Sequence, residues 1–518
     1  MAGPSAAPRR DPRPSPVPPA GAPPADRAAA IKAAEALHAD GLRHQQAGRL
    51  DEARAAYEAV LVLVPEATVT RSNLGNVLRA QGDFAAAIAA QRAALADDPN
   101  YAHGWSNLAL ALQDAGHGPA AVSAARHAST LAPTDPEIRY TQGTIELALG
   151  QAKDAIDSFL AVLGTQPRHS RALLNLAVAL KECGATAAGA TALETLIAFE
   201  PDNADAHFNL ALNLLAAGEW ARGFPAYEWR LRVPGLGPSV PSSPRWDGTP
   251  QPGKTLLLVA EQGLGDTFQF VRFALRARAR VGRVVLAAQK PLLACLAGAV
   301  GIDTVVDRDA PLPAHDLHLP LMSLPFALDV AAGDELGETP WLAVDHDRKA
   351  EWRDWLDRTV PARRLRVGIA WRGNPAYRKD ATRSLALANF VPLTALSGVS
   401  LISLQKGPGE DEWRDTPEVR LLQPPDLDRD APFVDTAALL ESLDLVICSD
   451  SALTHLAGAL GRPTWILLSH RPDWRWGDAG TETPWYSSAT LIRQAEPGDW
   501  SGVFGRAAAA LAALSGGK

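Results

Sequence analysis

Two kinds of apolar pattern divide the chain. From about residue 30 to residue 231, apolar and small residues recur at the spacing of amphipathic helices. From residue 255 onward, short continuous apolar runs alternate with helical stretches. The segment between them, residues 232–252, is dense in proline, glycine and serine, which is typical of a connector. The sequence therefore predicts a helical part, a linker and an α/β part.

The helical part repeats with a period of 34 residues. A small residue recurs in the first helix of each unit, at Gly41, Gly75, Ala109, Gly143, Ala177 and Ala211, and a proline closes five units, at Pro65, Pro99, Pro133, Pro167 and Pro201. The pattern resembles the tetratricopeptide repeat, a helix–turn–helix unit whose small residues let neighbouring helices approach. It predicts an α-solenoid of about six repeats over residues 27–231, a fold that commonly binds a peptide.

A ladder of asparagines follows the same period. Asn73, Asn107, Asn175 and Asn209 each stand two residues before the small residue of their unit. An amide side chain can donate to and accept from a peptide backbone, so these residues are candidates for acceptor binding along the groove. The arrangement resembles the asparagine ladder of the eukaryotic O-linked N-acetylglucosamine transferases. The alternative is that each asparagine bonds only between neighbouring helices.

The α/β part contains two sets of strand-like runs. The first set lies at residues 255–260, 281–288 and 303–307, and the second at residues 364–371, 400–406, 443–449 and 464–469. Short buried strands that alternate with helices predict parallel sheets covered on both faces. We expect two Rossmann-like halves, residues 253–348 and 349–518, that face a cleft, with ligands beyond the carboxyl ends of the strands.

The loop after the first strand, AEQGLGDTFQF, carries a candidate base. Gly263 and Gly265 are expected to form a tight turn, and Asp266 follows at the start of a helix. One interpretation makes Asp266 a helix cap, with Gln269 completing a capping box. The other makes it a carboxylate in the cleft that takes a proton from an acceptor hydroxyl.

A basic loop follows the first strand of the second half. Arg372, Arg378, Lys379 and Arg383 lie within twelve residues, and Lys406 ends the next strand. A solvated loop is the simple interpretation. Cations at this end of a sheet also suit a ligand that carries phosphate.

The stretch CSDSALTHLAGALGRP joins a strand to a helix. Asp450 and Ser451 stand at the junction, and Thr454 and His455 lie one turn into the helix. A helix N-terminus with a hydroxyl is a ready anion site, although a plain cap would use the same residues. Together with the basic loop, the stretch predicts a site for the phosphate of a nucleotide sugar.

Composition narrows the class of protein. The net charge is −8, from 50 basic and 58 acidic residues, which argues against a nucleic-acid partner. Three cysteines lie far apart and fit a reducing compartment, so we expect a cytoplasmic protein. No segment has the length of a membrane span, and no secretion signal follows the Arg9-Arg10 pair. Residues 1–26 are rich in proline and alanine and are predicted to be disordered.

Several of these stretches resemble one family in combination. EQGLGDTFQFVRFA, VGIAWRGNPAYRKDATRSL, LISLQKGPGE, DTAALLESLDLVICSDSALTHLAGALGRPTWILL and RPDWRWGDAGTETPWY are similar to bacterial tetratricopeptide-repeat glycosyltransferases. The catalytic part of those proteins is related to the heptosyltransferases of glycosyltransferase family 9. The resemblance implies a GT-B fold and an inverting, metal-independent transfer from a nucleotide sugar, with no further cofactor. Some members glycosylate flagellin, which makes flagellin the expected partner of the repeats.

The resemblance also assigns roles to residues. Asp266 is the expected catalytic base. The expected donor-binding residues are Trp371, Asn374, Lys379, Arg383, Gln405, Lys406, Asp450, Ser451, Thr454 and His455. Relatives more often have threonine where this chain has Ser451, and serine keeps the hydroxyl. Trp474 and Trp476 are expected either to stack on a base or sugar or to pack against the sheet.

Three functions remain open at this stage. The first is a protein O-glycosyltransferase whose repeats hold the acceptor. The second is a repeat scaffold with a non-catalytic domain that binds a sugar nucleotide. The third is a lipopolysaccharide heptosyltransferase, which leaves the repeats without a role. The sequence leaves the donor sugar, its nucleotide and the oligomeric state undefined.

Overall fold

The computed structural model describes residues 24–334, 336, 340–377 and 379–516. Within them the chain divides into two compact units, one up to Phe199 and one from Glu200 onward. The tail predicted to be disordered, residues 1–26, lies outside the described residues except for its last three. Those three begin the first helix, which starts at Pro24.

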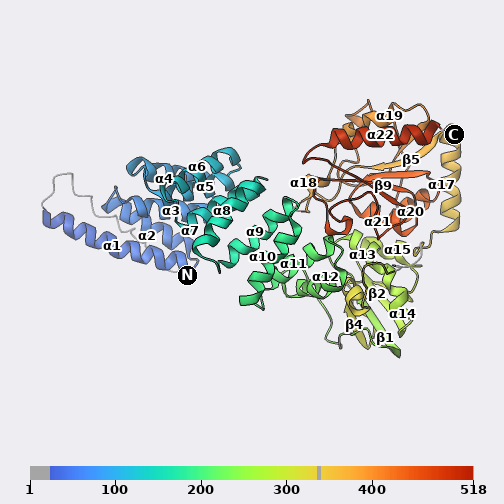
Figure 1. The fold of residues 1–518 in the computed structure, drawn as a ribbon, viewed down its shortest axis with the longest axis horizontal. Coiled ribbons are helices and arrows are strands. Elements are labelled where there is room, and N and C mark those ends of the chain that lie inside the picture. Colours follow the sequence, from blue (N-terminus) through green and yellow to red (C-terminus); the bar gives the residue numbers. More distant parts are fainter. Residues whose placement is uncertain (1–23, 335, 337–339, 378, 517–518) are drawn as a thin grey trace, which may run out of the picture. The chain divides into compact units, whose positions relative to one another are not determined.

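The first unit is an array of helical hairpins, labelled in Figure 1. The helices are α1 (Pro24–Gln46), α2 (Leu50–Leu63), α3 (Thr68–Ala80), α4 (Phe84–Asp97), α5 (Ala102–Asp114), α6 (Gly118–Leu131), α7 (Pro136–Ala148), α8 (Ala152–Thr165), α9 (Ser170–Glu182) and α10 (Thr186–Phe199). The predicted helical solenoid is confirmed for this part of the chain.

In two repeats, the small residue of the first helix lies against an aromatic ring of the second. A Cβ atom added at Gly41 would lie 2.4 Å from the Tyr57 ring, and one added at Gly143 would lie 2.7 Å from the Phe159 ring. Both rings are fully buried. These two positions therefore require glycine, because the partner ring fills the space that even a Cβ atom would need.

A second periodic glycine, not used in the sequence analysis, turns the chain between the two helices of each hairpin. Gly48, Gly82, Gly116, Gly150, Gly184 and Gly218 all have φ between +71° and +83°. Glycine adopts this left-handed conformation at the helix C-terminus without a steric cost. These glycines also recur every 34 residues, so the signal was present in the sequence.

The sixth predicted hairpin belongs to the second unit. It consists of α11 (Ala204–Ala216) and α12 (Trp220–Tyr227), followed by the 3₁₀ helix η1 (Glu228–Arg232). Trp220 stacks on Trp485 with ring centroids 4.9 Å apart, and Tyr227 lies 6.0 Å from Trp474. The repeat period thus predicted these helices correctly, but their aromatic face packs on the α/β part.

Two parallel sheets form the rest of the second unit. The first has the order β3-β2-β1-β4, from β1 (Gln251–Val259), β2 (Val281–Ala288), β3 (Thr304–Asp307) and β4 (Leu317–Pro320). The second has the order β10-β9-β8-β5-β6-β7, from β5 (Leu365–Ala370), β6 (Val399–Ser403), β7 (Leu421–Leu422), β8 (Leu445–Ser449), β9 (Thr464–Leu468) and β10 (Ala489–Arg493).

The parallel sheets confirm that part of the prediction, although β4, β7 and β10 were not foreseen. Strand β1 begins at Gln251, so the last two residues of the predicted linker are in a strand. Short helices connect the strands: α13 (Leu264–Phe270), α14 (Ala274–Arg278), α15 (Leu293–Leu296), α16 (Leu324–Ala327), α17 (His346–Thr359), α18 (Asp380–Arg383), α19 (Val391–Thr394), α20 (Val434–Leu440) and α21 (Ala452–Ala459). The 3₁₀ helices are η2 (Val271–Phe273), η3 (Lys290–Leu292), η4 (Leu321–Ser323), η5 (Leu387–Phe390), η6 (Glu412–Arg414) and η7 (Trp474–Trp476).

The last helix, α22 (Trp500–Gly516), covers one face of the second sheet together with α19 (Figure 1). Val503 and Phe504 of α22 join Val367 and Ile369 of β5 in one buried apolar cluster. Strands whose side chains are buried on both faces appear in the sequence as continuous apolar runs. Among the described residues, no helix combines the length and hydropathy needed to cross a membrane.

A buried ion pair joins η1 to the end of β1. Arg230 donates from Nε to Glu261 Oε2 at 3.0 Å and from Nη2 to Glu261 Oε1 at 2.7 Å. Arg230 is 0 % exposed and Glu261 is 2 % exposed. Met322 N–H donates to the same carboxylate at 3.1 Å. The pair therefore fixes the sixth hairpin to the loop that carries Asp266.

We predict that Arg230→Met destabilises the second unit because it leaves the Glu261 carboxylate buried without its partner. Breaking a buried pair in this way costs about 3–5 kcal/mol of the free energy of unfolding. Chemical denaturation followed by circular dichroism measures the loss. Arg429→Ala, which removes a surface pair with Asp426, is the control and should leave the unfolding midpoint unchanged. If Arg230→Met lowered the free energy of unfolding as little as the control does, this account of the Arg230–Glu261 ion pair would be contradicted.

Candidate functional site

A cavity of about 1170 Å³ lies within the second unit. Its walls are the segments that follow β1, β3, β5, β6, β7, β8 and β9, the start of α21, and residues 235–239 of the connector. Loops from both sheets therefore contribute at the carboxyl ends of their strands, where parallel sheets bind ligands.

The cavity wall includes most of the residues predicted from the sequence. Those that line it are Asp266, Asn374, Arg383, Gln405, Lys406, Asp450, Ser451 and His455. Trp371, Lys379 and Thr454 are not in the lining. The Trp371 indole is buried and donates to Glu412 at 2.8 Å, and the Thr454 hydroxyl donates to the Ser449 carbonyl at 2.9 Å. The Lys379 side chain is exposed, and Arg378 lies outside the described residues.

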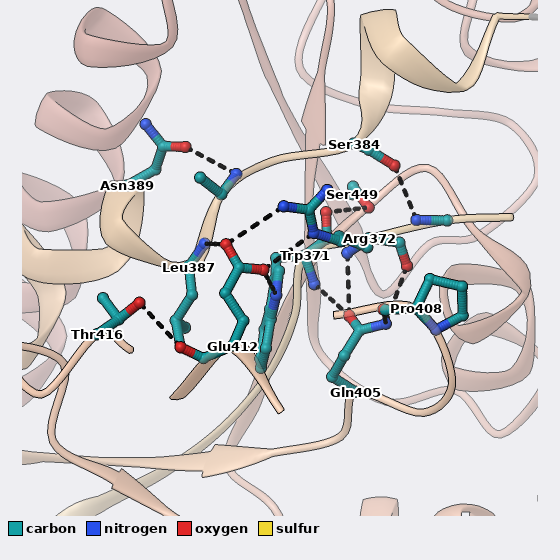
Figure 2. Close-up of polar contacts among 12 residues, drawn as sticks. Trp371, Arg372, Ser384, Leu387, Asn389, Gln405, Pro408, Glu412, Thr416 and Ser449 are labelled. Carbon is teal, nitrogen blue, oxygen red and sulfur yellow. Dashed lines mark hydrogen bonds and ion pairs between the residues drawn. The ribbon is translucent and has the colours of Figure 1, made fainter. Parts of the chain in front are cut away.

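Gln405 ties together the loops that follow β5 and β6, as Figure 2 shows. Its Oε1 accepts from the backbone N–H groups of Trp371 and Arg372, each at 2.9 Å. Its Nε2 donates to the Pro408 carbonyl at 2.9 Å. Because these bonds occupy both ends of the amide, the contribution of Gln405 is to shape the cavity wall.

Two of the cations that line the cavity, Arg383 and Lys406, each contact a carboxylate. Arg383 donates to Asp380 at 3.1 Å, and Lys406 contacts Glu410 at 2.6 Å. The side chains of Arg383 and Lys406 remain 21 % and 43 % exposed. An anionic ligand would compete with these acids for cations that are still accessible from the cavity.

Gly265 brings the first turns of α13 and α21 together. A Cβ atom added there would lie 2.6 Å from His455 Cδ2. The sequence predicts a tight turn at Gly263 and Gly265, and the structure shows that the left-handed residue of this turn is neither of them. Neither Gly263 nor Gly265 has a positive φ, whereas Gln262 has φ +54°. Gln262 adopts the left-handed conformation in this turn. Position 265 requires glycine because His455 occupies the space that a side chain would need.

Asp266 lies in the cavity wall with both oxygens engaged. Its Oδ2 accepts from the Gly263 N–H at 2.7 Å, and its Oδ1 pairs with Arg475. Gly263 is the N-cap of α13, and Asp266 is the third residue of the helix, where its carboxylate accepts from the N-cap N–H as in a capping box, so the capping interpretation is correct in part. Gln269 does not complete a capping box and accepts from Arg475 instead. Burial raises the pKa of Asp266, and the Arg475 guanidinium opposes this rise.

His455 and Asp450 have shifted acidities. Burial lowers the pKa of His455 to about 3, and Arg475 adds to the effect. Its Nδ1 lies 2.7 Å from the Tyr486 hydroxyl, and its ring stacks on Trp476. Burial and the neighbouring Asp473 raise the pKa of Asp450 to about 6. A neutral imidazole in the first turn of α21 thus lies near a carboxyl of raised pKa just before the N-cap of that helix.

Ser451 is the N-cap of α21 and has no side-chain cap bond. Its hydroxyl lines the cavity beside the first turn of the helix. The interpretation of Ser451 as a plain side-chain cap is therefore not supported. A hydroxyl and a helix N-terminus that face a cavity together are suited to an anionic oxygen.

The two tryptophans of η7 pack instead of lining the cavity. Trp474 and Trp476 are 4 % and 2 % exposed. Trp474 contacts Tyr227 and Trp485, and Trp476 contacts His455. Between them, Arg475 reaches the cavity. Sequence reasoning missed Arg475 and Tyr486, although both lie in the aromatic stretch RPDWRWGDAGTETPWY.

The asparagine ladder makes bonds within the protein. Asn107 donates to the Ser72 hydroxyl at 3.0 Å, and Asn175 donates to the Tyr140 hydroxyl at 3.1 Å, each in the preceding repeat. Asn209 donates to the carbonyl of Asp205 in its own helix and belongs to the second unit. Asn73 is half-buried in α3. Asn107 and Asn175 therefore make the bonds between neighbouring repeats that the alternative interpretation requires.

Two protein families match parts of the chain. The family described as tetratricopeptide repeat matches residues 38–102, 72–136, 106–166 and 140–182. Glycosyltransferase family 9 (heptosyltransferase) matches residues 432–498, which contain α20, β8, α21, β9, η7 and β10. The second match thus covers the wall of the cavity from Asp450 to Arg475.

Individual proteins are also similar to this chain over all or part of its length. Protein FlbA of Caulobacter vibrioides is 28 % identical over 511 residues, which is 92 % of this chain and 84 % of that protein. BBSome complex member BBS4 of Mus musculus is 25 % identical over 154 residues, 30 % of each chain. A solved tetratricopeptide repeat protein from Parabacteroides merdae has 21 % identity and a TM-score of 0.33, covering 38 % of this chain and 78 % of its own.

We predict that His455 remains neutral from about pH 5 to about pH 8, because its lowered pKa lies below that range. NMR of protein labelled with ¹³C in its histidines follows the imidazole signal, and His455→Gln assigns it by loss. The signal should not titrate in this range. A titration midpoint inside the range would contradict the effect ascribed to burial.

Proposed function

We propose that this chain, which joins tetratricopeptide repeats to a glycosyltransferase family 9 region, is a protein O-glycosyltransferase. It moves a sugar from a nucleotide sugar to a serine or threonine of a protein acceptor held by the repeats. The resemblance to repeat-bearing bacterial transferases makes flagellin the proposed acceptor. The proposed reaction is inverting, takes place in a GT-B cleft in the cytoplasm, and uses no metal or further cofactor.

The observation that carries the proposal is the distribution of charge around the cavity. Asp266 lies on the wall contributed by the loop after β1. Arg383, Lys406 and the N-terminus of α21 lie on the wall contributed by the second sheet. A base on one side and cations on the other are what a displacement at a sugar–phosphate bond needs.

The transfer then proceeds in one displacement. Asp266 accepts the proton of the acceptor hydroxyl as that oxygen forms a bond to the anomeric carbon. The bond from this carbon to the phosphate oxygen breaks on the opposite face, which inverts the anomeric centre. The electron pair leaves with the nucleotide phosphate, and Arg383, Lys406 and Ser451 at the helix end stabilise its charge.

The repeats supply the acceptor site in this proposal. Asn73, Asn107 and Asn175 are half-buried in first helices of the array. Each bonded amide retains a second N–H and lone pairs on its oxygen, so a bond to the preceding repeat orients the group without exhausting it. This supports contact with an acceptor backbone of any sequence.

We predict that nucleoside diphosphates bind the full chain and that binding depends on the cavity cations. Titration calorimetry with UDP, GDP and ADP, and with CMP, identifies the preferred nucleotide. Arg383→Gln should weaken its binding by about tenfold or more, because a charge-assisted bond to phosphate contributes about 1.5–3 kcal/mol.

Lys379→Gln is the matched control, since it removes a charge from the same loop outside the cavity lining. It should change the dissociation constant by less than about threefold, since an exposed charge contributes little. Absence of binding by all four nucleotides would contradict the proposed function. Equal losses for the two variants would contradict the placement of phosphate beside Arg383.

A further inference from the structure

Arg475, which lines the cavity, binds three different partners. Its Nη1 donates to Asp473 Oδ1 at 2.7 Å, its Nη2 pairs with Asp266, and its Nε donates to Gln269. The first partner lies beside Arg475 in the chain, and the other two lie more than 200 residues away on α13. Arg475 is 8 % exposed, so little solvent competes for these bonds.

The side chain of Arg475 is held in place by packing as well as by charge. Its guanidinium carbon lies 4.6 Å from the centroid of the Trp474 ring and 5.7 Å from that of Phe270. A planar guanidinium between aromatic neighbours and fixed acceptors loses little freedom when it binds a carboxylate. The geometry therefore fixes the position of the Asp266 Oδ1 atom, while the Gly263 N–H fixes Oδ2.

We propose that Arg475 is a positioning residue that holds the Asp266 carboxylate ionised and oriented toward the cavity. The inference rests on the proposed function, because that function gives Asp266 its role as the base. The experiment that tests the inference needs no substrate and does not depend on that role. In this account Arg475 contacts neither the acceptor nor the donor and acts through Asp266.

The charges that face Asp266 set the sign of the effect. Arg475 and Arg383 lower the pKa of Asp266, whereas burial and Asp473 raise it. The other titratable groups around it are the hydroxyls of Tyr227 and Tyr486 and the neutral His455, which contacts Gly265. Without the Arg475 charge, burial and Asp473 act with only Arg383 in opposition, and the Asp266 carboxyl takes up a proton at a higher pH.

Thermal unfolding of the full chain reads this acidity without any substrate. Because the folded-state pKa of Asp266 is raised, its contribution to stability is complete at low pH and is lost as the pH rises through that pKa. The melting temperature of wild type minus that of Asp266→Asn should therefore fall with pH and then level off. The pH of levelling reports the folded-state pKa.

We predict that this levelling point moves to higher pH in an Arg475→Gln background, by about one pH unit or more, as expected when a close guanidinium is lost. Arg308→Gln is the matched control, since Arg308 lines the same cavity but donates to the Ala260 carbonyl. It should move the point by less than about a third of a unit, because Arg308 is bonded to the Ala260 carbonyl whereas Arg475 is paired with the carboxylate itself. Equal levelling points in the wild-type and Arg475→Gln backgrounds would overturn the proposal.

A second background keeps the test decisive if Arg475→Gln does not fold. Asp473→Asn removes a negative charge that raises the pKa of Asp266, and it keeps the Arg475 charge with its bonds to Asp266 and Gln269. Its levelling point should move to lower pH, opposite to that of Arg475→Gln, and an unchanged point would count against the proposal. If the wild-type protein showed no transferase activity, the proposed function would be refuted. The melting temperatures would still decide the role of Arg475.

Discussion

The candidate site depends on one close approach, that of α13 and α21 at Gly265. His455 occupies the space where any side chain at that position would lie. The contact brings the loop after β1 beside the loop after β8, although β1 and β8 belong to different sheets. Asp266 and Asp450 therefore line one cavity. A larger residue at position 265 would separate the two helices and with them the two walls.

Buried arginines stabilise the elements around this contact. Arg230 binds Glu261 and fixes the sixth hairpin to the loop after β1. Arg475 binds Asp266 and Gln269 and fixes the segment after β9 to α13. Arg272 lies over the Trp341 ring at 4.0 Å, and burial lowers its pKa to about 10. These cations keep nearby acids ionised or a nearby histidine neutral, so structural and electrostatic roles coincide in the same side chains.

Features that depend on residues close together in the chain could be predicted from the sequence. The period of small residues found the helices of the repeats, and apolar runs found β1, β2, β3, β5, β6, β8 and β9 within a few residues. Strand β7 was missed because it has only two residues. The packing of α12 on the α/β part could not be foreseen, since Trp220 and Trp485 are distant in sequence.

The same reasoning explains the errors at the site. Asp266 follows glycine at the start of a helix, which suggested an N-cap, but the cap is decided by the backbone angles of Gly263. Arg475 lay in a stretch that resembled the family, and nothing local indicates that its partner is Asp266. The family resemblance assigned Trp371 to the donor, but its side chain belongs to a buried apolar cluster. Pairings across sheets require the fold.

Intact-mass spectrometry of flagellin tests the central claim most directly. Flagellin is isolated from host cells with the gene, without it, and with the gene carrying Asp266→Asn. The account predicts that flagellin loses the mass of its glycans without the gene, and that wild type restores this mass whereas Asp266→Asn does not. The mass increment then identifies the sugar. An identical flagellin mass in all three strains would contradict the account.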